Sequence, residues 1–235
     1  MSKTALVTGA SRGIGFETTR RFILNHDDIT TVVMFARDSE DFDNNVKELE
    51  KELPIGRKLV PYKVDVGDRS ALKKAVKRAY DEVGNIDILV NNAGYTNPVP
   101  LQQVKMADFE KTMEVNVYAP FTIIKALLNR GNTFDLIVNI ASTAGINGRS
   151  GWLTYSASKA AVINMSQVMR EELSIYGTRV VCLSPGRTAT ALRKTLAPDE
   201  DPTTIMQPEH VAQVISTLSS SVGKFIDSEN IVVRQ

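Results

Sequence analysis

A tyrosine and a lysine stand four residues apart in the stretch YSASK, with only small residues between them. On a helix, residues at this spacing lie on one face, so Tyr155 and Lys159 would be neighbours. A tyrosine ordinarily has a pKa near ~10, and a cation beside it favours the phenolate and lowers that pKa. The pair is therefore a candidate acid/base group. It is equally a tyrosine packed against a lysine stem, and the rest of the chain has to decide between the two interpretations.

Three glycines follow the first apolar stretch, in the sequence TGASRGIG. Gly9 would allow a tight turn, while Gly13 and Gly15 would let the backbone and the next helix approach a phosphate closely. The N-terminus of that helix offers free N–H groups and a positive dipole end to a pyrophosphate. An ordinary turn between a strand and a helix could also hold these glycines. Their place in the first strand–helix unit favours dinucleotide binding.

The elements that would position these groups alternate along the chain. Apolar stretches with little polar alternation are typical of strands buried on both faces, and they occur at 4–9, 30–36, 58–64, 86–94, 134–142, 179–186 and 229–235. Helical stretches lie between them, at 13–25, 69–84, 107–130 and 155–177. The charged segment 38–58 is interpreted as a solvated helix face. This alternation predicts an α/β fold, with one parallel sheet covered by helices on both faces, in a single domain spanning 1–235.

Composition narrows the class of protein. The chain has 235 residues, 43% of them hydrophobic, and a formal net charge of +1, so no global field draws it to nucleic acid or an acidic membrane. The single cysteine, Cys182, excludes an intramolecular disulfide, and His26 and His210 lack companions for a metal site. No apolar run approaches the ~18 residues of a membrane span, and the first apolar stretch begins too close to Met1 for a signal peptide. A cytoplasmic enzyme or binding protein is expected.

Five motifs occur in a specific order: the glycine turn, NNAG at 91–94, Ser142, YSASK at 155–159 and PG at 185–186. In order and separation they resemble the short-chain dehydrogenase/reductase family over nearly the whole chain. The resemblance implies a Rossmann-type, doubly wound sheet of seven parallel strands and a bound nicotinamide dinucleotide. It also implies hydride transfer to or from a carbonyl or alcohol carbon.

The resemblance assigns four catalytic residues. Tyr155 would protonate the carbonyl oxygen as hydride reaches the carbon, and would act as the base in the reverse direction. Lys159 would hydrogen-bond the nicotinamide ribose and, with the oxidised nicotinamide ring, favour the phenolate. Ser142 would hold the substrate oxygen and stabilise its developing charge, although a serine there could simply cap a loop. Asn116, an unfavourable residue for a helix interior, resembles the family asparagine that holds a water behind the lysine.

The end of the second strand bears on the choice of nicotinamide cofactor. A site that prefers NAD places Asp or Glu there, to hold the ribose 2′-hydroxyl. In this chain the stretch ends with Ala36 and Arg37, and Arg12 lies in the glycine loop. Two guanidinium groups suit a 2′-phosphate, so the sequence predicts NADP(H). Asp38 is contrary evidence, because a register shift of one or two residues would bring it to the ribose.

Further cofactor contacts come from the resemblance alone. Asp65 would meet the adenine amino group, although it could instead cap the next helix, for which Asp68 or Ser70 is better placed. The remaining assigned positions lie in the glycine loop and after the third, fourth and sixth strands: Ser11, Ile14, Val66, Asn92, Ala93, Gly94, Pro185, Gly186, Thr188 and Thr190.

The substrate edge is expected to carry four basic residues: Arg149, Arg187, Arg193 and Lys194. Each could be an ordinary solvated surface charge. Arginine pairs well with phosphate or carboxylate, and residues 187–215 are weakly similar to the tail of reductases that convert ribulose 5-phosphate to ribitol 5-phosphate. These observations predict a small anionic keto compound, such as a keto-sugar phosphate, as the substrate.

Two alternatives remain beside that prediction. One is a general reductase of ketones, aldehydes or 3-oxoacyl thioesters. The other is a dinucleotide-binding regulatory protein without activity, which the presence of all four catalytic residues disfavours. The long helices that carry Asn116 and Tyr155 have intact apolar faces, which predicts a homodimer or homotetramer. The chain stops at NIVVRQ without the glycine-rich stretch of many relatives, so C-terminal subunit contacts stay open.

Overall fold

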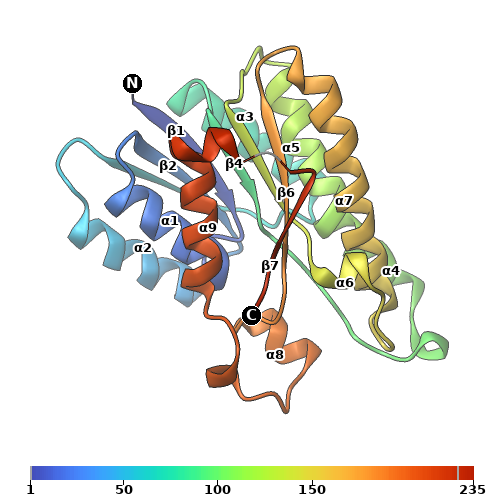
Figure 1. Ribbon diagram of the computed structural model, residues 1–235. Coiled ribbons are helices and arrows are strands. Elements are labelled where there is room, and N and C mark those ends of the chain that lie inside the picture. The colour runs from blue at the N-terminus through green and yellow to red at the C-terminus, as the bar shows by residue number, and fades with distance from the viewer. Residues whose placement is uncertain (1, 227) are drawn as a thin grey trace.

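The computed structural model describes residues 2–226 and 228–235 and contains one seven-stranded parallel sheet (Figure 1). The strand order is β3-β2-β1-β4-β5-β6-β7. Their bounds are β1 Lys3–Thr8, β2 Ile29–Ala36, β3 Lys58–Lys63, β4 Ile88–Asn91, β5 Leu136–Ile140, β6 Arg179–Pro185 and β7 Asn230–Val233. Each predicted apolar stretch overlaps one of these strands, with starts that differ by no more than two residues. This confirms the expected Rossmann-type, doubly wound fold.

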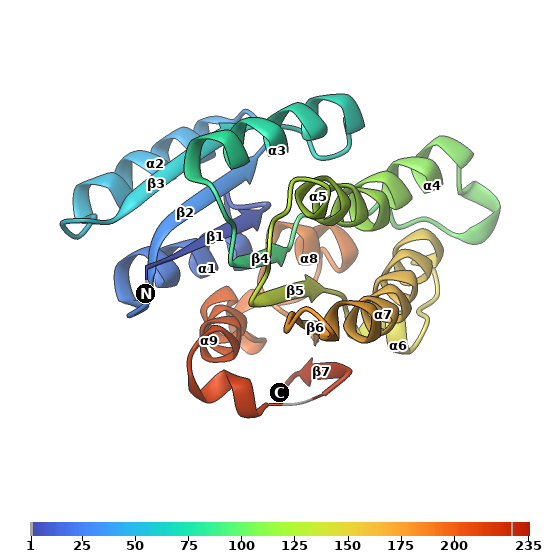
Figure 2. The same cartoon turned by 90° about the horizontal axis from the view of Figure 1, so that it is seen from above.

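The helices cover both faces of the sheet. They are α1 Gly13–Asn25, α2 Glu40–Glu52, α3 Arg69–Val83, α4 Met106–Met113, α5 Ala119–Leu128, α6 Thr143–Ile146, α7 Leu153–Ser174, α8 Ala191–Leu196 and α9 Pro208–Ser219. Figure 2 shows α1 and α9 on one side of the strands, and α3, α5 and α7 on the other. Two buried clusters match these layers, because alternate residues of a strand face opposite sides. In β1, Val7 joins the cluster of α1 and α9, whereas Leu6 joins that of α3 and α5.

The winding of the sheet fixes where a ligand can bind. The chain runs from β1 outward to β2 and β3, then crosses back to place β4 on the other side of β1. The strand order therefore reverses between β1 and β4. In sheets of this kind, ligands bind in the crevice outside the carboxyl ends of the strands at that switch point. The glycine turn follows β1, and the NNAG segment overlaps and follows the end of β4.

The charged segment 38–58 is more than a solvated face. It forms α2, which Ser39 caps by accepting a hydrogen bond from the Phe42 N–H. Phe42, Val46 and Leu49 are buried along one stripe of this helix and belong to the same cluster as α1. Most of the charged residues of α2 are exposed, as interpreted from the sequence, while the spacing of these three apolar residues places them on the opposite, buried face.

The stretch 107–130 is not one regular helix. A π-helical turn, Glu114–Tyr118, joins α4 to α5, and the Ala119 N–H donates to the Glu114 carbonyl. Pro120 lacks an N–H, so it cannot donate to the carbonyl of Asn116 four residues earlier. The regular α-helical hydrogen-bond pattern therefore cannot continue unbroken through this point. The wider π-helical turn accommodates the missing hydrogen bond. Asn116 lies in this turn.

Three further features of the described residues concern membrane insertion, metal binding and the single cysteine. No described helix is long and apolar enough to cross a membrane. Across residues 2–226 and 228–235, no group of three His, Cys, Asp or Glu side chains could hold a metal ion. Cys182 is buried in β6, and burial raises the pKa of its thiol to about 11.

Candidate active site

A cleft of about 920 Å³ lies along the carboxyl edge of the sheet. Its walls come from the glycine turn, the ends of the strands from β2 to β6, the first turns of α7 and the chain around α8. All the predicted cofactor, catalytic and substrate residues line this cleft except Gly15, Asn116 and Lys194. Stretches far apart in the sequence therefore converge on one site.

The glycine turn is fastened to the loop after β4. Gly9 and Gly13 have positive φ angles, of 67° and 56°, which favour glycine. A Cβ on Gly15 would lie 2.2 Å from the Gly9 carbonyl oxygen and 2.5 Å from Asn92 Nδ2, so no side chain fits there. The buried Thr8 hydroxyl accepts hydrogen bonds from the N–H groups of Asn92 and Ala93, both at 3.0 Å. These contacts hold both loops at the switch point.

The N-terminus of α1 faces the cleft without a side-chain cap. Arg12 occupies the capping position and makes no capping hydrogen bond. The cleft is lined there by Ser11, Gly13 and Ile14. The first N–H groups of a helix have no partner inside the helix, so this end can receive an anionic group such as a pyrophosphate.

The end of the cleft near the glycine turn and the end of β2, called the far end below, carries charges of both signs. Arg12 and Arg37 line it, and Arg12 Nη1 lies 3.9 Å from an Asp41 carboxylate oxygen with both side chains more than half exposed. Asp38 forms an ion pair of 2.8 Å with Lys63, at the end of β3. The carboxylate that argued against NADP(H) therefore has a cationic partner in the protein.

Asp65 does not cap α3. Its Oδ1 accepts a hydrogen bond from the Gly67 N–H at 2.8 Å, which closes a turn after β3. Asp68 is the cap of α3 and accepts from the N–H groups of Ser70 and Ala71. Asp65 remains exposed and lines the cleft beside Val66, so its predicted contact with adenine stays a prediction.

Tyr155 and Ser142 come together on the wall of the cleft. Ser142 follows β5 and caps α6, where its hydroxyl accepts from the Ala144 N–H at 3.1 Å. Tyr155 lies in the first turn of α7 and is 6% exposed. Burial raises the pKa of its phenol, while a hydrogen bond with Ser142 and the charge of Arg193 act in the opposite direction. At neutral pH this phenol keeps its proton.

Lys159 lies one turn further along α7 and is 4% exposed. Its Nζ donates a hydrogen bond of 2.7 Å to the Ile140 carbonyl and lies 5.7 Å from the centre of the Tyr155 ring. Burial lowers the pKa of the ammonium group to about 8. In the chain by itself the pKa of Tyr155 is raised, so the expected lowering by Lys159 together with the oxidised nicotinamide ring stays a prediction. The ammonium group is bound to a carbonyl, and burial of the phenol outweighs the charges around it.

Asn116 fastens the π-helical turn to two neighbouring segments. Its Oδ1 accepts from the Tyr95 N–H at 2.8 Å, and its Nδ2 donates to the Tyr95 carbonyl at 3.0 Å and to Ser158 Oγ at 2.9 Å. Ser158 in turn donates to the Tyr155 carbonyl at 2.7 Å. Asn116 is 1% exposed, so it supports the helix that carries Tyr155 from behind rather than facing the cleft.

The loop after β6 closes one side of the cleft. The Gly186 N–H donates to the Val233 carbonyl at 2.8 Å, and Thr188 hydrogen-bonds the Gly186 carbonyl at 3.3 Å. Thr190 caps α8 by accepting from the Arg193 N–H at 3.1 Å. Pro185, Gly186, Thr188 and Thr190 line the same cleft as Tyr155.

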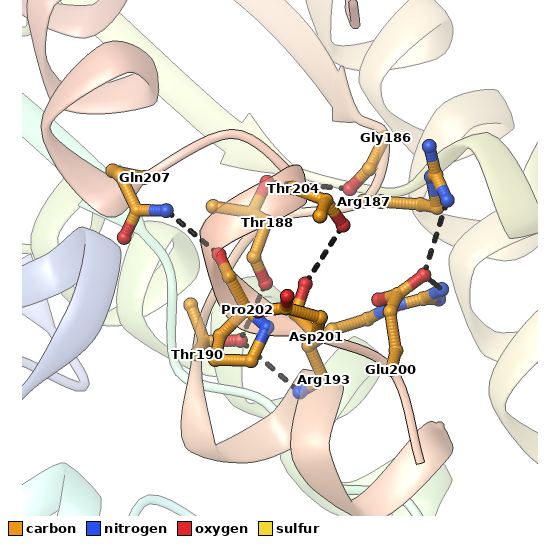
Figure 3. A network of polar contacts seen from close by, with 10 residues as sticks. All are labelled: Gly186, Arg187, Thr188, Thr190, Arg193, Glu200, Asp201, Pro202, Thr204 and Gln207. Carbon is orange, nitrogen blue, oxygen red and sulfur yellow. Dashed lines mark hydrogen bonds and ion pairs between the residues drawn. The ribbon is translucent and has the colours of Figure 1, made fainter. Parts of the chain in front are cut away.

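Two of the predicted substrate arginines already have an anionic partner. Figure 3 shows the side chains of Arg187 and Arg193 converging on the carboxylate of Glu200. Arg193 binds it through two bonds, from Nε at 2.5 Å and from Nη2 at 2.6 Å, and Arg187 Nη1 lies 3.3 Å from it. This contact could not be predicted from the residue pattern, because it depends on the path of the loop after α8, which brings Glu200 back to Arg193.

Trp152 is a second residue that the sequence analysis missed. Two guanidinium groups lie near its ring, with Arg193 Cζ 5.6 Å and Arg149 Cζ 5.9 Å from the ring centre. It also meets the Tyr155 ring edge to face, with the ring centres 6.4 Å apart. A lone tryptophan three residues before the tyrosine was the available signal. Lys194 is exposed and does not line the cleft.

Comparison with known proteins agrees with this site. The family model of the short chain dehydrogenases matches residues 3–201. The chain is 34% identical to 3-oxoacyl-(acyl-carrier-protein) reductase FabG from Thermotoga maritima, over 97% of this chain and 94% of that protein. It is 37% identical to the L-fucose dehydrogenase of Mus musculus, over 83% of this chain and 68% of that protein.

Solved structures give the same picture. A short chain dehydrogenase from Burkholderia cenocepacia in complex with NADP is 28% identical, with a TM-score of 0.86 over 98% of this chain and 96% of that one. A blue fluorescent protein from a metagenomic library in complex with NADPH has the same identity, TM-score and coverage. The glycine turn at the switch point and the family match lead to one conclusion. The chain is an oxidoreductase of the short-chain dehydrogenase/reductase family, with a nicotinamide dinucleotide as its cofactor.

Proposed function

We propose that the protein reduces a ketone or aldehyde to an alcohol, with NADPH as the hydride donor. The observation that carries the proposal is that the buried Tyr155 and Ser142 line the same cleft as Arg12 and Arg37. A candidate proton donor, Tyr155, and two candidate phosphate-binding residues, Arg12 and Arg37, therefore line one cleft. The reduced nicotinamide would supply the hydride to the carbonyl carbon.

Each of the four residues takes one role in this proposal. The Ser142 and Tyr155 hydroxyls hydrogen-bond the carbonyl oxygen, and as the carbon accepts hydride the Tyr155 O–H bond breaks and its proton passes to that oxygen. The raised pKa of Tyr155 suits this direction, because the group carries a proton before the reaction. Lys159 holds the nicotinamide ribose, and Asn116 positions the helix of Tyr155 through Ser158.

The preference for NADP(H) rests on the charges at the far end of the cleft. Arg12 and Arg37 would hold the 2′-phosphate, since guanidinium groups bind phosphate through paired hydrogen bonds. Lys63 forms an ion pair with the carboxylate of Asp38, which would otherwise repel that phosphate. The NADP and NADPH complexes of the structural neighbours support the same choice.

The rest of the cofactor would follow the lining of the cleft. The glycine turn and the N-terminus of α1 would hold the pyrophosphate, with no side-chain cap in the way. Asp65 and Val66 would meet the adenine. The segment 92–94 would run past the adenosine ribose, and the loop 185–190 would hold the nicotinamide carboxamide.

For the substrate, the similar proteins favour a general ketoreductase over the anionic keto compound predicted from the sequence. That prediction relied on four basic residues, Arg149, Arg187, Arg193 and Lys194, and two of them, Arg187 and Arg193, share the carboxylate of Glu200. A 3-oxoacyl thioester is a specific candidate, because two relatives at 34% and 32% identity are 3-oxoacyl-(acyl-carrier-protein) reductases. Sugar-like ketones are a second candidate, since the L-fucose and gluconate 5-dehydrogenases are also similar.

The test is NADPH oxidation by the pure protein over a panel of carbonyl compounds. The panel contains simple ketones and aldehydes, 3-oxoacyl thioesters, and keto sugars with and without phosphate, each run with NADPH and with NADH. We expect at least one uncharged ketone to be reduced, with NADPH preferred. Ser142→Ala should slow the reaction by about 10²-fold, as for removal of one donor to a developing oxyanion. Absence of turnover across the panel would contradict the proposal.

We also propose that the protein is a homodimer or homotetramer. Tyr118 and Phe121 are 43% and 47% exposed at the start of α5, and Val168 on α7 is 49% exposed. The helices that carry Asn116 and Tyr155 therefore present apolar groups outward, as the sequence predicted. Light scattering coupled to size exclusion should give a mass of two or four chains, and a single-chain mass would contradict this.

A further inference from the structure

Trp152 supplies an aromatic surface beside the proposed proton donor. It is the single tryptophan of the chain, it lines the cleft and it is partly exposed. Its ring meets that of Tyr155 edge to face, with the ring centres 6.4 Å apart. A ketone whose oxygen hydrogen-bonds the Tyr155 hydroxyl therefore has a substituent within reach of the indole.

Contacts of its backbone and of its ring hold Trp152 in place. The Trp152 N–H donates to the Arg149 carbonyl at 3.1 Å, and the Trp152 carbonyl accepts from the Ser156 N–H at 2.8 Å. Arg193 Cζ lies 5.6 Å from the ring centre, and Glu200 binds this guanidinium group through hydrogen bonds of 2.5 Å and 2.6 Å. The indole is therefore an ordered part of the cleft wall before any substrate arrives.

Two leucines of α8 add to the apolar surface of the cleft. Leu192 and Leu196 are four residues apart, so they lie on one face of the helix, and both line the cleft. Arg193 of the same helix lies near Trp152, which places α8 beside the indole. Leu192 Cδ1 lies 3.4 Å from the position that a Cβ would take on Gly94, so this leucine reaches the loop after β4. Apolar groups from two elements therefore line the cleft around the indole.

We propose that Trp152 determines which ketones the protein reduces, by packing against an apolar substituent of the carbonyl carbon. An alkyl chain or an aromatic ring loses contact with water when it packs against the indole, and this burial favours binding. Because the indole is already ordered, little freedom is lost when the substituent binds. Ketones with an alkyl or aryl substituent are therefore preferred over ketones with a short or a polar one. This inference rests on the proposed carbonyl reductase activity and names the substrate class of that site.

The test uses uncharged ketones alone, because Arg149, Arg187 and Arg193 also line the cleft and act on any charged substrate. The kcat/KM with NADPH is measured for 2-butanone, 2-pentanone and 2-hexanone. It is also measured for 4-methoxy-2-butanone, in which an oxygen replaces one methylene group of 2-hexanone. Wild type should gain about threefold in kcat/KM for each added methylene group. It should also prefer 2-hexanone over the ether of the same length, by about threefold or more.

Three variants assign this preference to the indole. Trp152→Ala removes the ring and should lose most of the gain per methylene group and most of the preference over the ether. Trp152→Phe keeps an aromatic ring and should retain both. Leu153→Ala is the matched control, because Leu153 is the next residue of the chain, is 44% exposed and does not line the cleft, so it should keep the wild-type preference. Thermal unfolding and NADPH binding are measured for each variant to confirm that it folds.

The outcomes separate the inference from the proposed function. If wild type reduces all four ketones equally well, or prefers the shortest, the inference is overturned while the reductase activity stands. It is also overturned if Trp152→Ala keeps the wild-type preference, if Trp152→Ala reduces 2-hexanone better than wild type does, or if Leu153→Ala loses the preference equally. If Trp152→Ala does not fold, Trp152→Gln takes its place in the comparison. No turnover of the four ketones by wild type overturns the inference, and failure over the whole carbonyl panel overturns the proposed function as well.

Discussion

Replacing Gly15 with alanine should damage the cofactor site through backbone contacts that cannot be relieved by rotating a side chain. The added Cβ would lie 2.2 Å from the Gly9 carbonyl oxygen and 2.8 Å from its carbonyl carbon. It would also lie 2.5 Å from Asn92 Nδ2, which donates to the Thr8 and Gly9 carbonyls. Relief requires the glycine turn to open and Asn92 to move away from the end of β1.

The magnitude follows from these contacts. Overpacking of a close-packed site costs about 1–3 kcal/mol, and loss of the Asn92 hydrogen bonds adds about 1 kcal/mol. We therefore expect the free energy of unfolding of Gly15→Ala to fall by about 2–4 kcal/mol. The dissociation constant of NADPH should rise by about tenfold or more, which corresponds to a binding loss of about 1.4 kcal/mol.

Two measurements check this prediction, urea unfolding and NADPH fluorescence titration. Gly148→Ala is the matched control, because no described atom lies within 4 Å of a Cβ at Gly148 and its φ angle is not positive. The control should unfold and bind NADPH as wild type does. The reasoning would be refuted if Gly15→Ala kept wild-type stability and affinity, or if both alanine variants lost them equally.

Three further predictions concern the cofactor, the buried lysine and the π-helical turn. Arg37→Asp should weaken NADPH binding and improve NADH binding, measured by titration with each, and equal affinities of wild type for both would contradict the arginine argument. The pKa of Lys159 is lowered from 10.5 to about 8, so the unfolded chain binds more protons between those values and the contribution of Lys159 to stability rises with pH there. The unfolding free energy of wild type relative to Lys159→Met should therefore rise by about 3 kcal/mol between about pH 7 and about pH 10.5, and a constant difference would contradict the lowered pKa. Asn116→Leu removes three hydrogen bonds and should lower the free energy of unfolding by about 2–4 kcal/mol in urea titrations, whereas a loss under about 0.5 kcal/mol would contradict the structural role.

The sheet and the place of the site were predictable from the sequence for a physical reason. Parallel strands buried on both faces are continuous apolar runs, and their ends are marked by small and polar residues. The positions after β1 and β4 could therefore be identified as the binding edge before the structure was known. The stripe of Phe42, Val46 and Leu49 in α2 was also present in the sequence, but the charges around it obscured it.

Other features depend on the path of the chain in space. The π-helical turn has nearly the same apolar spacing as a regular helix, so Pro120 was the only local sign of it. The hydrogen bond from Lys159 to the Ile140 carbonyl depends on how α7 crosses the end of β5. The pairing of Arg193 with Glu200 depends on a loop that turns back on itself, and side-chain types alone predicted an anion-binding pair there instead.

The central claim is that Tyr155 donates the proton in carbonyl reduction. The most direct measurement is the kcat for the best ketone, together with the dissociation constant of NADPH, in wild type and Tyr155→Phe. Tyr176→Phe is the matched control, because Tyr176 is 69% exposed just after the end of α7 and does not line the cleft. We predict that Tyr155→Phe loses about 10²-fold or more in kcat and binds NADPH nearly as wild type does, while the control is unaffected. Near-normal turnover by Tyr155→Phe would contradict the account.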